Sequence, residues 1–80
     1  METPVVMPPM GDAAGDLVVE AWYKQVGDEI VKGEPLFQVA TDKVTIDIEA
    51  LVTGRLNRIV HEKDSTAEIG EIVAYIEVNG

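Results

Sequence analysis

The sequence predicts an all-β fold, and three observations indicate it. Aromatic residues make up only 5% of the chain, so that Val, Ile, Leu and Ala carry most of the apolar content, and the β-branched residues among them favour strands. Short apolar segments alternate with turn signals at close spacing, as in a β-sandwich or barrel. No stretch of the sequence shows a helical period of apolar residues long enough to predict a helix instead of strands. A chain of 80 residues allows a single domain, residues 1–80, with a thin core.

The first half of the chain contains three predicted strands. Residues 3–7 form a short strand that ends at Pro8 and Pro9, because proline has no N–H group to donate to a sheet. After a surface loop, residues 16–24 are apolar at most positions, which predicts a strand buried on much of both faces. Residues 36–39 form the next strand. Turn signals precede it at Gly27–Asp28 and at Gly33–Pro35.

A hairpin follows in the middle of the chain. Residues 44–49 have the clearest alternation of apolar and polar residues in the sequence, which predicts a strand with one face in the core. On this pattern Val44, Ile46 and Ile48 point into the core. Lys43 then lies at the tip of the hairpin.

The second half of the chain repeats the order of strands and turns of the first. Residues 56–60 follow Gly54 as a strand, residues 63–65 form a turn and residues 72–78 form the last strand. This order predicts two intertwined half-domains related by a pseudo-two-fold axis. The axis would place Lys43 at one end of the molecule and the two chain termini at the other.

The charge of the chain excludes several classes of partner. Fifteen acidic and six basic residues give a formal charge of -9, which repels nucleic acid and anionic membranes. The chain has no cysteine, so it has neither disulfides nor a thiolate of its own. It contains neither an apolar run of roughly 18 residues nor a signal peptide, and we expect a soluble intracellular domain.

Most candidate reactive groups have a simpler structural interpretation. His61 has Asp64 and Ser65 close in sequence, but three residues at one strand–turn junction rarely converge as a triad, and we expect His61 to be a solvated strand residue. One histidine without cysteine does not provide a metal site. The glycines match no phosphate-binding pattern. Trp22, in a dense apolar run, is expected at the core or its edge.

Two carboxylates follow the hairpin on the predicted outer face. Asp47 and Glu49 are two residues apart in one strand, so both point to the same side. Acid/base catalysis would need a desolvated cleft that shifts a pKa, whereas the alternation places this pair in water. We expect a solvated or partner-facing acidic surface.

Lys43 fits the demands of covalent modification best. A lysine that receives an acyl group must project beyond the backbone, and a hairpin tip allows this better than the centre of a strand. It must also be held at a reproducible position, which the flanking strands provide. An ordinary exposed hairpin lysine is the alternative interpretation.

The stretch Thr41-Asp42-Lys43-Val44 resembles the lysine motif of lipoyl domains, the carrier modules of the acyltransferase (E2) components of 2-oxo acid dehydrogenase complexes. The similarity extends over nearly the whole chain. The matching residues stand in the family's order: Met7-Pro8, Trp22, Lys24, Gly27-Asp28, Gly33, Leu36, the lysine motif and Gly54. A departure occurs at Ala40, where many members carry an acidic residue that bears on partner recognition.

The resemblance implies a flattened barrel of two four-stranded antiparallel sheets with pseudo-two-fold symmetry. It also implies lipoate covalently attached to Lys43. The domain would then be a monomeric carrier without a catalytic site, and its partners would be the E1 decarboxylase, the E2 catalytic domain, the E3 dihydrolipoyl dehydrogenase and a lipoate-attaching enzyme. Asp42, Asp47 and Glu49, with the loop 10–15 as a possible neighbour, are the hypothesised recognition surface. We expect an N-terminal module of a longer E2 chain, cytoplasmic in bacteria or archaea and in the mitochondrial matrix in eukaryotes.

Two other functions are compatible with the sequence. A biotinyl carrier domain of a carboxylase shares this fold, but biotin acceptors usually have methionine on both sides of the lysine, where this chain has Asp42 and Val44. The lipoyl carrier of glycine cleavage is a longer chain. An unmodified β-module for binding or assembly is the other alternative, and in that case Lys43 would be dispensable.

Overall fold

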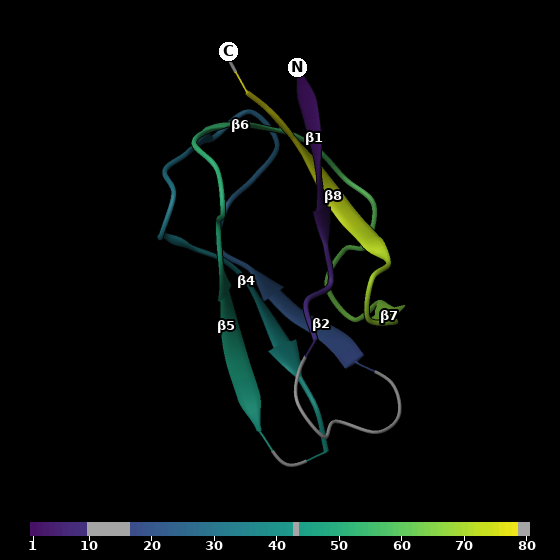
Figure 1. The fold of residues 1–80 in the computed structure, drawn as a ribbon. Coiled ribbons are helices and arrows are strands. Elements are labelled where there is room, and N and C mark those ends of the chain that lie inside the picture. The colour runs from purple at the N-terminus through teal and green to yellow at the C-terminus, as the bar shows by residue number, and fades with distance from the viewer. Residues whose placement is uncertain (10–16, 43, 79–80) are drawn as a thin grey trace.

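The computed structural model describes residues 1–9, 17–42 and 44–78, in which all regular secondary structure is β-strand (Figure 1). The strands are β1 (Glu2–Val6), β2 (Leu17–Trp22), β3 (Glu29–Ile30), β4 (Pro35–Ala40), β5 (Thr45–Glu49), β6 (Gly54–Ile59), β7 (Thr66–Ala67) and β8 (Ile72–Glu77). They form two four-stranded sheets, in the orders β1-β8-β6-β3 and β5-β4-β2-β7, and every pairing is antiparallel. These residues contain no helix that is long and apolar enough to span a membrane. The expected all-β class and two-sheet architecture are confirmed.

The two halves of the chain are related by the expected pseudo-two-fold axis. Strands β1 to β4 correspond in order to strands β5 to β8. When each strand is replaced by its counterpart, the sheet order β1-β8-β6-β3 becomes β5-β4-β2-β7. The register shift in the β2–β4 pair between Val19 and Ala21 recurs in the β6–β8 pair between Leu56 and Arg58. The turns repeat as well: backbone φ is positive at Gly27 and at its counterpart Asp64, and at Gly33 and its counterpart Gly70.

The axis places the β4–β5 turn and the chain termini at opposite ends of the molecule (Figure 1). Thr41 N–H donates to Val44 O at 2.8 Å across the turn, and Val78 N–H donates in the same way to Met1 O at 2.8 Å. The pairing of Thr41 with Val44 is thus the counterpart of the pairing of Val78 with Met1. Lys43, which the sequence predicts at this turn, lies outside the described residues.

The core fills the space between the two sheets. Its buried side chains come from six of the eight strands and from the residues that directly follow β1 and β5: Met7, Leu17, Val19, Ile30, Leu36, Phe37, Val39, Ala50, Leu56, Ala67, Val73, Ala74 and Ile76. Trp22 packs at the edge of this core, with its ring centroid 4.8 Å from that of Phe37, and its Nε1–H donates to His61 O at 2.8 Å. The expected core-edge position of Trp22 is confirmed.

Two short strands and one burial pattern differ from the sequence-based expectation. β3 and β7 have two residues each and were not predicted, because so short a segment shows no alternation. The expected strand 16–24 is β2, in which only Leu17 and Val19 are fully buried and Glu20 is exposed. The prediction of burial on both faces was wrong, since each sheet packs against the other on one face only.

The β5 strand is less buried than its alternation suggests. Ile48 packs against the core, but Ile46 is 38% exposed and Val44, just before the strand, is 52% exposed. The prediction that all three point into the core was therefore wrong for Val44 and Ile46. β5 is an edge strand of its sheet, so it has a neighbour on one side only, and alternation cannot distinguish an edge strand from a central one.

His61 is neither solvated nor part of a strand, which corrects the sequence-based expectation. It follows the end of β6, and only 18% of its side chain is exposed. Its Nε2 lies 2.6 Å from Glu71 Oε2, while Glu71 Oε1 accepts a hydrogen bond from Glu68 N–H at 2.9 Å. The hydrogen bond from Glu68, followed by that with His61, lowers the pKa of the Glu71 carboxyl below its ordinary value of 4.5.

The lowered pKa of Glu71 predicts a contribution to acid stability. A carboxyl whose pKa is lower in the folded state stabilises the fold at pH values above its ordinary pKa of 4.5. This contribution is lost as the pH falls through the lowered folded-state pKa. Glu71→Gln should therefore be less stable than the wild type at pH 7, and the difference should shrink below pH 4.5. Urea unfolding at several pH values measures it. Glu62→Gln, at an exposed residue of the same region, is the control for the loss of one carboxylate.

Candidate functional site at the β4–β5 turn

The β4–β5 turn is closed by Thr41 and Val44 at its two ends. Besides the backbone hydrogen bond of 2.8 Å, Thr41 Oγ1 accepts from Val44 N–H at 3.1 Å and donates to Val44 O at 3.2 Å. A side chain that bonds back to its own turn in this way fixes the turn geometry. Asp42 and Val44, the sequence neighbours of Lys43, are both exposed.

The base of the turn rests on the core. The hairpin register pairs Ala40 with Thr45 and Val39 with Ile46, and Val39 is completely buried. Its burial anchors the β4 side of the hairpin, so the turn projects from a fixed support. Ala40 is half-buried at this base, and its effect on partner recognition stays a prediction.

Asp47 is held in place by two side chains that the sequence analysis missed. Its Oδ1 accepts a hydrogen bond from Tyr23 Oη–H at 2.7 Å and another from Gln38 Nε2–H at 3.1 Å. Gln38 Nε2 also donates to Tyr23 Oη at 3.0 Å. Gln38 is paired with Asp47 in the β4–β5 register, so this contact could have been predicted from the sequence if the register had been known. We call Tyr23, Gln38 and Asp47 the polar triangle.

The polar triangle makes a spectroscopic prediction. The hydrogen bond to Asp47, together with burial and the Asp47 charge, raises the pKa of the Tyr23 phenol above its ordinary value of 10.0. In a Tyr75→Phe background Tyr23 is the one tyrosine, since the chain has two, and its ultraviolet absorbance gives the pKa. Asp47→Ala should lower this pKa towards 10.0. Asp42→Ala, which removes a different carboxylate near the turn, should leave it unchanged.

The three proposed recognition carboxylates occupy different places. Asp42 is exposed in the turn, Asp47 belongs to the polar triangle, and Glu49 is exposed at the far end of β5, opposite Pro35. Asp47 and Glu49 both line one groove of the surface, whereas Asp42 does not. The expectation that Asp47 and Glu49 face water is confirmed, and the loop 10–15 lies outside the described residues.

The remaining candidate groups do not form a reactive site. His61 pairs with Glu71 rather than with Asp64 or Ser65, and Asp64 occupies a turn position with φ of 73°. Within residues 1–9, 17–42 and 44–78, no three His, Cys, Asp or Glu side chains are grouped so that they could hold a metal ion. These described groups therefore do not define the candidate site, which leaves the β4–β5 turn as the place to consider.

The turn suits a covalently attached group that extends into solvent. The described residues of the turn and the start of β5, namely Asp42, Val44 and Thr45, are all exposed. They therefore do not enclose a cavity into which an attached group would have to fit. A chain without cysteine would need the group to bring its own sulfur for thiol chemistry.

Comparison with known proteins agrees with this geometry. A family model described as "Biotin-requiring enzyme" for the biotin/lipoyl family matches residues 3–76. The chain is 36% identical over 74 residues to the dihydrolipoyllysine-residue acetyltransferase component of the pyruvate dehydrogenase complex of Corynebacterium glutamicum, covering 92% of this chain and 11% of that protein. It is 30% identical over 77 residues to the succinyltransferase component of the 2-oxoglutarate dehydrogenase complex of Bartonella vinsonii, covering 96% of this chain and 19% of the relative.

A solved structure shows the same fold. The lipoyl domain of the 2-oxoglutarate dehydrogenase complex from Azotobacter vinelandii aligns with a TM-score of 0.72 and 25% identity, covering 99% of this chain and 98% of that domain. The chain thus spans a whole solved domain but only 11% and 19% of the two acyltransferase components. With a family model that matches most of its length, the chain belongs to the biotin/lipoyl attachment family.

Proposed function

We propose that this domain is a lipoyl carrier and that Lys43 is its attachment site. The observation that carries the proposal is the exposed β4–β5 turn, which is closed by Thr41 and Val44 and supported by buried Val39. Lys43 is the residue between Asp42 and Val44 in this turn. The relatives, named as dihydrolipoyllysine components, support lipoate over biotin.

The residues of the chain act by holding and presenting the attached group. When attached, lipoate would supply a dithiolane that takes up an acyl group together with two electrons. Thr41 fixes the turn, and the buried base at Val39 keeps the attachment point at one place. Amide formation at Lys43 removes one positive charge, and the formal charge of -9 becomes -10. The loaded tip is therefore more acidic than the unloaded tip.

The partners follow from this function. We propose that the domain is one module of a longer E2 chain and serves an E1 decarboxylase, an E2 catalytic domain and an E3 dihydrolipoyl dehydrogenase, after loading by a lipoate-attaching enzyme. The relatives named in the comparisons are E2 components, and this chain matches a small share of their length. A tethered carrier meets its partners at an effective concentration of about millimolar, which raises transfer rates without a tight interface.

Intact-mass measurement tests the proposal and separates it from biotin attachment. The unmodified chain is incubated with lipoate, ATP and a lipoate ligase, and in parallel with biotin, ATP and a biotin ligase. We expect one lipoyl mass increase per chain and no biotinyl increase. A biotinyl increase alone would identify a biotin carrier, and no increase in either reaction would indicate an unmodified binding module.

We further propose that Asp42, Asp47 and Glu49 form the surface that the ligase and the decarboxylase recognise. All three are exposed, and Asp47 accepts two hydrogen bonds within the polar triangle, which lowers the cost of fixing its side chain in a complex. Glu49→Lys should slow lipoylation or reductive acylation, because an oppositely charged rim residue changes the association rate. Rates of both reactions measure this effect. Equal rates for Glu49→Lys and the wild type would remove Glu49 from the recognition surface.

A further inference from the structure

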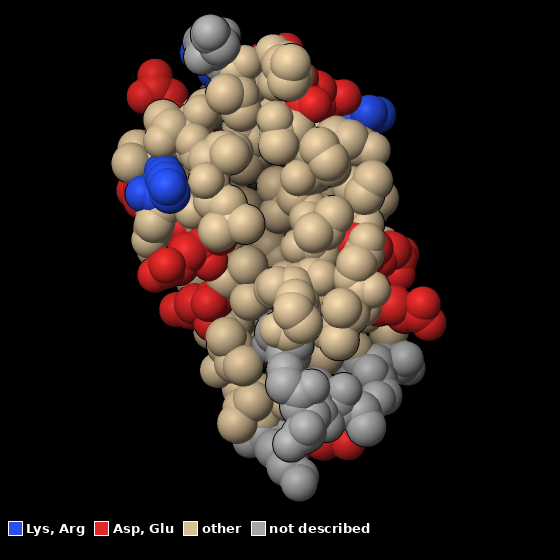
Figure 2. Space-filling view, in the orientation of Figure 1, with Lys and Arg blue, Asp and Glu red and all other residues tan. Residues whose placement is uncertain are grey.

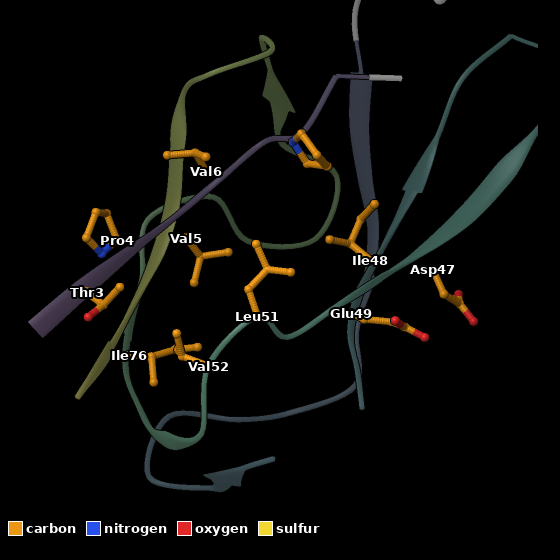
Figure 3. Close-up of a pocket in the computed structure, with 11 residues that line it drawn as sticks. Thr3, Pro4, Val5, Val6, Asp47, Ile48, Glu49, Leu51, Val52 and Ile76 are labelled. Atoms are coloured by element: carbon orange, nitrogen blue, oxygen red, sulfur yellow. The ribbon is translucent and has the colours of Figure 1, made fainter. Parts of the chain in front are cut away.

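An apolar groove runs between the edge strands of the two sheets. It has a volume of about 480 Å³ and is lined by β1, β5 and the loop 50–53 that follows β5, a size within the range of ligand-binding clefts. Leu51 lies at its centre, with Val5, Ile48 and Val52 around it (Figure 3). Leu51 is 80% exposed. An aliphatic side chain so exposed, inside an apolar groove, indicates a contact surface.

The groove is a consequence of the fold. β1 and β5 are counterparts under the pseudo-two-fold axis, and each is the outermost strand of its sheet. Val5 and its counterpart Ile48 pack only partly against the core, since the described part of the chain places no further strand over this seam. Val6, on the β1 side, is 45% exposed. Two half-exposed edges of the sandwich therefore form one continuous apolar strip.

The two walls of the groove differ in charge. Asp47 and Glu49 stand on the β5 wall, while the β1 wall presents Pro4 and Val6. Figure 2 shows the uncharged surface between these strands with acidic side chains along its borders, and a Lys or Arg above the acidic side chains on the left. With a formal charge of -9 on the chain, a second copy, an anionic membrane or a nucleic acid would be repelled from this acidic border. A cationic partner would be attracted.

We propose that the groove binds an extended segment of a partner protein that carries a large apolar side chain flanked by Lys or Arg. The apolar side chain packs against Leu51, and the flanking cations lie beside Asp47 and Glu49. β1 contains Pro4, which disfavours strand addition, whereas β5 contains no proline. The segment therefore runs along β5, where an edge strand can accept an extended peptide.

The groove lies on the same strand as the candidate site. Asp47 is four residues after Lys43 in sequence, and a strand rises about 3.3 Å per residue. A segment bound along β5 would thus hold its parent protein close to the β4–β5 turn. The groove is made by side chains of the unmodified chain, so this proposal stands independently of lipoate attachment.

Peptide display on the unmodified chain tests the proposal. Random heptapeptides are selected on the wild type, with counter-selection on Leu51→Ser, and the affinities of the enriched peptides are measured by fluorescence anisotropy. We expect sequences with a Leu, Phe or Trp next to Lys or Arg. Leu51→Ser and Glu49→Lys should each weaken binding about tenfold, a typical loss for a central interface residue.

Matched variants and a mapping measurement distinguish binding in the groove from nonspecific hydrophobic or electrostatic binding elsewhere on the surface. Ile69→Ser removes an exposed apolar residue elsewhere, and Glu62→Lys reverses a charge outside the groove; both should bind like the wild type. Amide chemical-shift changes should cluster on β1, β5 and the loop 50–53. The proposal is overturned if no peptide is enriched or if the consensus peptide is acidic. It is also overturned if the four variants weaken binding equally or if the chemical-shift changes map elsewhere. Sedimentation that shows two copies of the chain associating through this groove would overturn it as well.

Discussion

Gly54→Ala is expected to destabilise the fold by about 3 kcal/mol, at the upper end of the usual cost of overpacking. Gly54 begins β6, where the strand passes close to β8. An added Cβ would lie 2.9 Å from Ile76 Cγ2 and 3.0 Å from the Glu77 carbonyl carbon, and closer still to the Glu77 oxygen. Because two of these atoms belong to the backbone, relief requires the β6–β8 pair to separate.

Urea unfolding of Gly54→Ala beside Arg55→Ala measures this effect. Arg55 is the next residue of β6 and is exposed, so its substitution should change the free energy of unfolding by about 0.5 kcal/mol or less. Small domains have only about 5–15 kcal/mol of stability, and the Gly54 variant should unfold at a much lower urea concentration. Similar midpoints for the two variants would contradict the close approach of β6 and β8.

Lys43→Gln is expected to abolish loading and acyl transfer while leaving stability unchanged. Glutamine has no amine to form the amide with lipoate. The hydrogen bonds described for the turn join Thr41 and Val44, and Lys43→Gln leaves both of these residues in place. The free energy of unfolding should stay within about 0.5 kcal/mol of the wild type.

Ligase reactions on Lys43→Gln and Lys63→Gln measure this loss. Lys63 lies in an exposed turn, and Lys63→Gln removes the same charge without touching the proposed site. We expect no lipoyl mass increase and no decarboxylase-dependent acylation for Lys43→Gln, and full activity in both assays for Lys63→Gln. Loading of Lys43→Gln at the wild-type rate would exclude Lys43 as the acceptor.

Much of the fold could be predicted because its signals are local. The alternation in 44–49 and the turn residues Gly27, Gly33 and Gly70 lie within a few residues of the features they specify. Among the residues that the structure describes, three of the four positive φ angles fall on these glycines. β3 and β7 could not be predicted, since two residues show no period. Their pairing with β6 and β2 is a tertiary effect.

The candidate site could be predicted only in part. The lysine motif is contiguous in sequence, so it located the β4–β5 turn. The polar triangle joins Gln38 of β4 and Asp47 of β5 with Tyr23, which follows β2, and its detection needs the register of β4 against β5. The exposure of Ile46 and the groove beside Leu51 depend on β5 being an edge strand. Alternation alone does not reveal the order of strands in a sheet.

Fragment mass spectrometry of the loaded chain tests the central claim most directly. The chain has four lysines that could accept an acyl group, namely Lys24, Lys32, Lys43 and Lys63. After reaction with lipoate and a lipoate ligase, we expect the added lipoyl mass on the fragment that contains Lys43 and on no other. A lipoyl group on Lys24, Lys32 or Lys63, with Lys43 unmodified, would contradict the assignment of the β4–β5 turn as the carrier site.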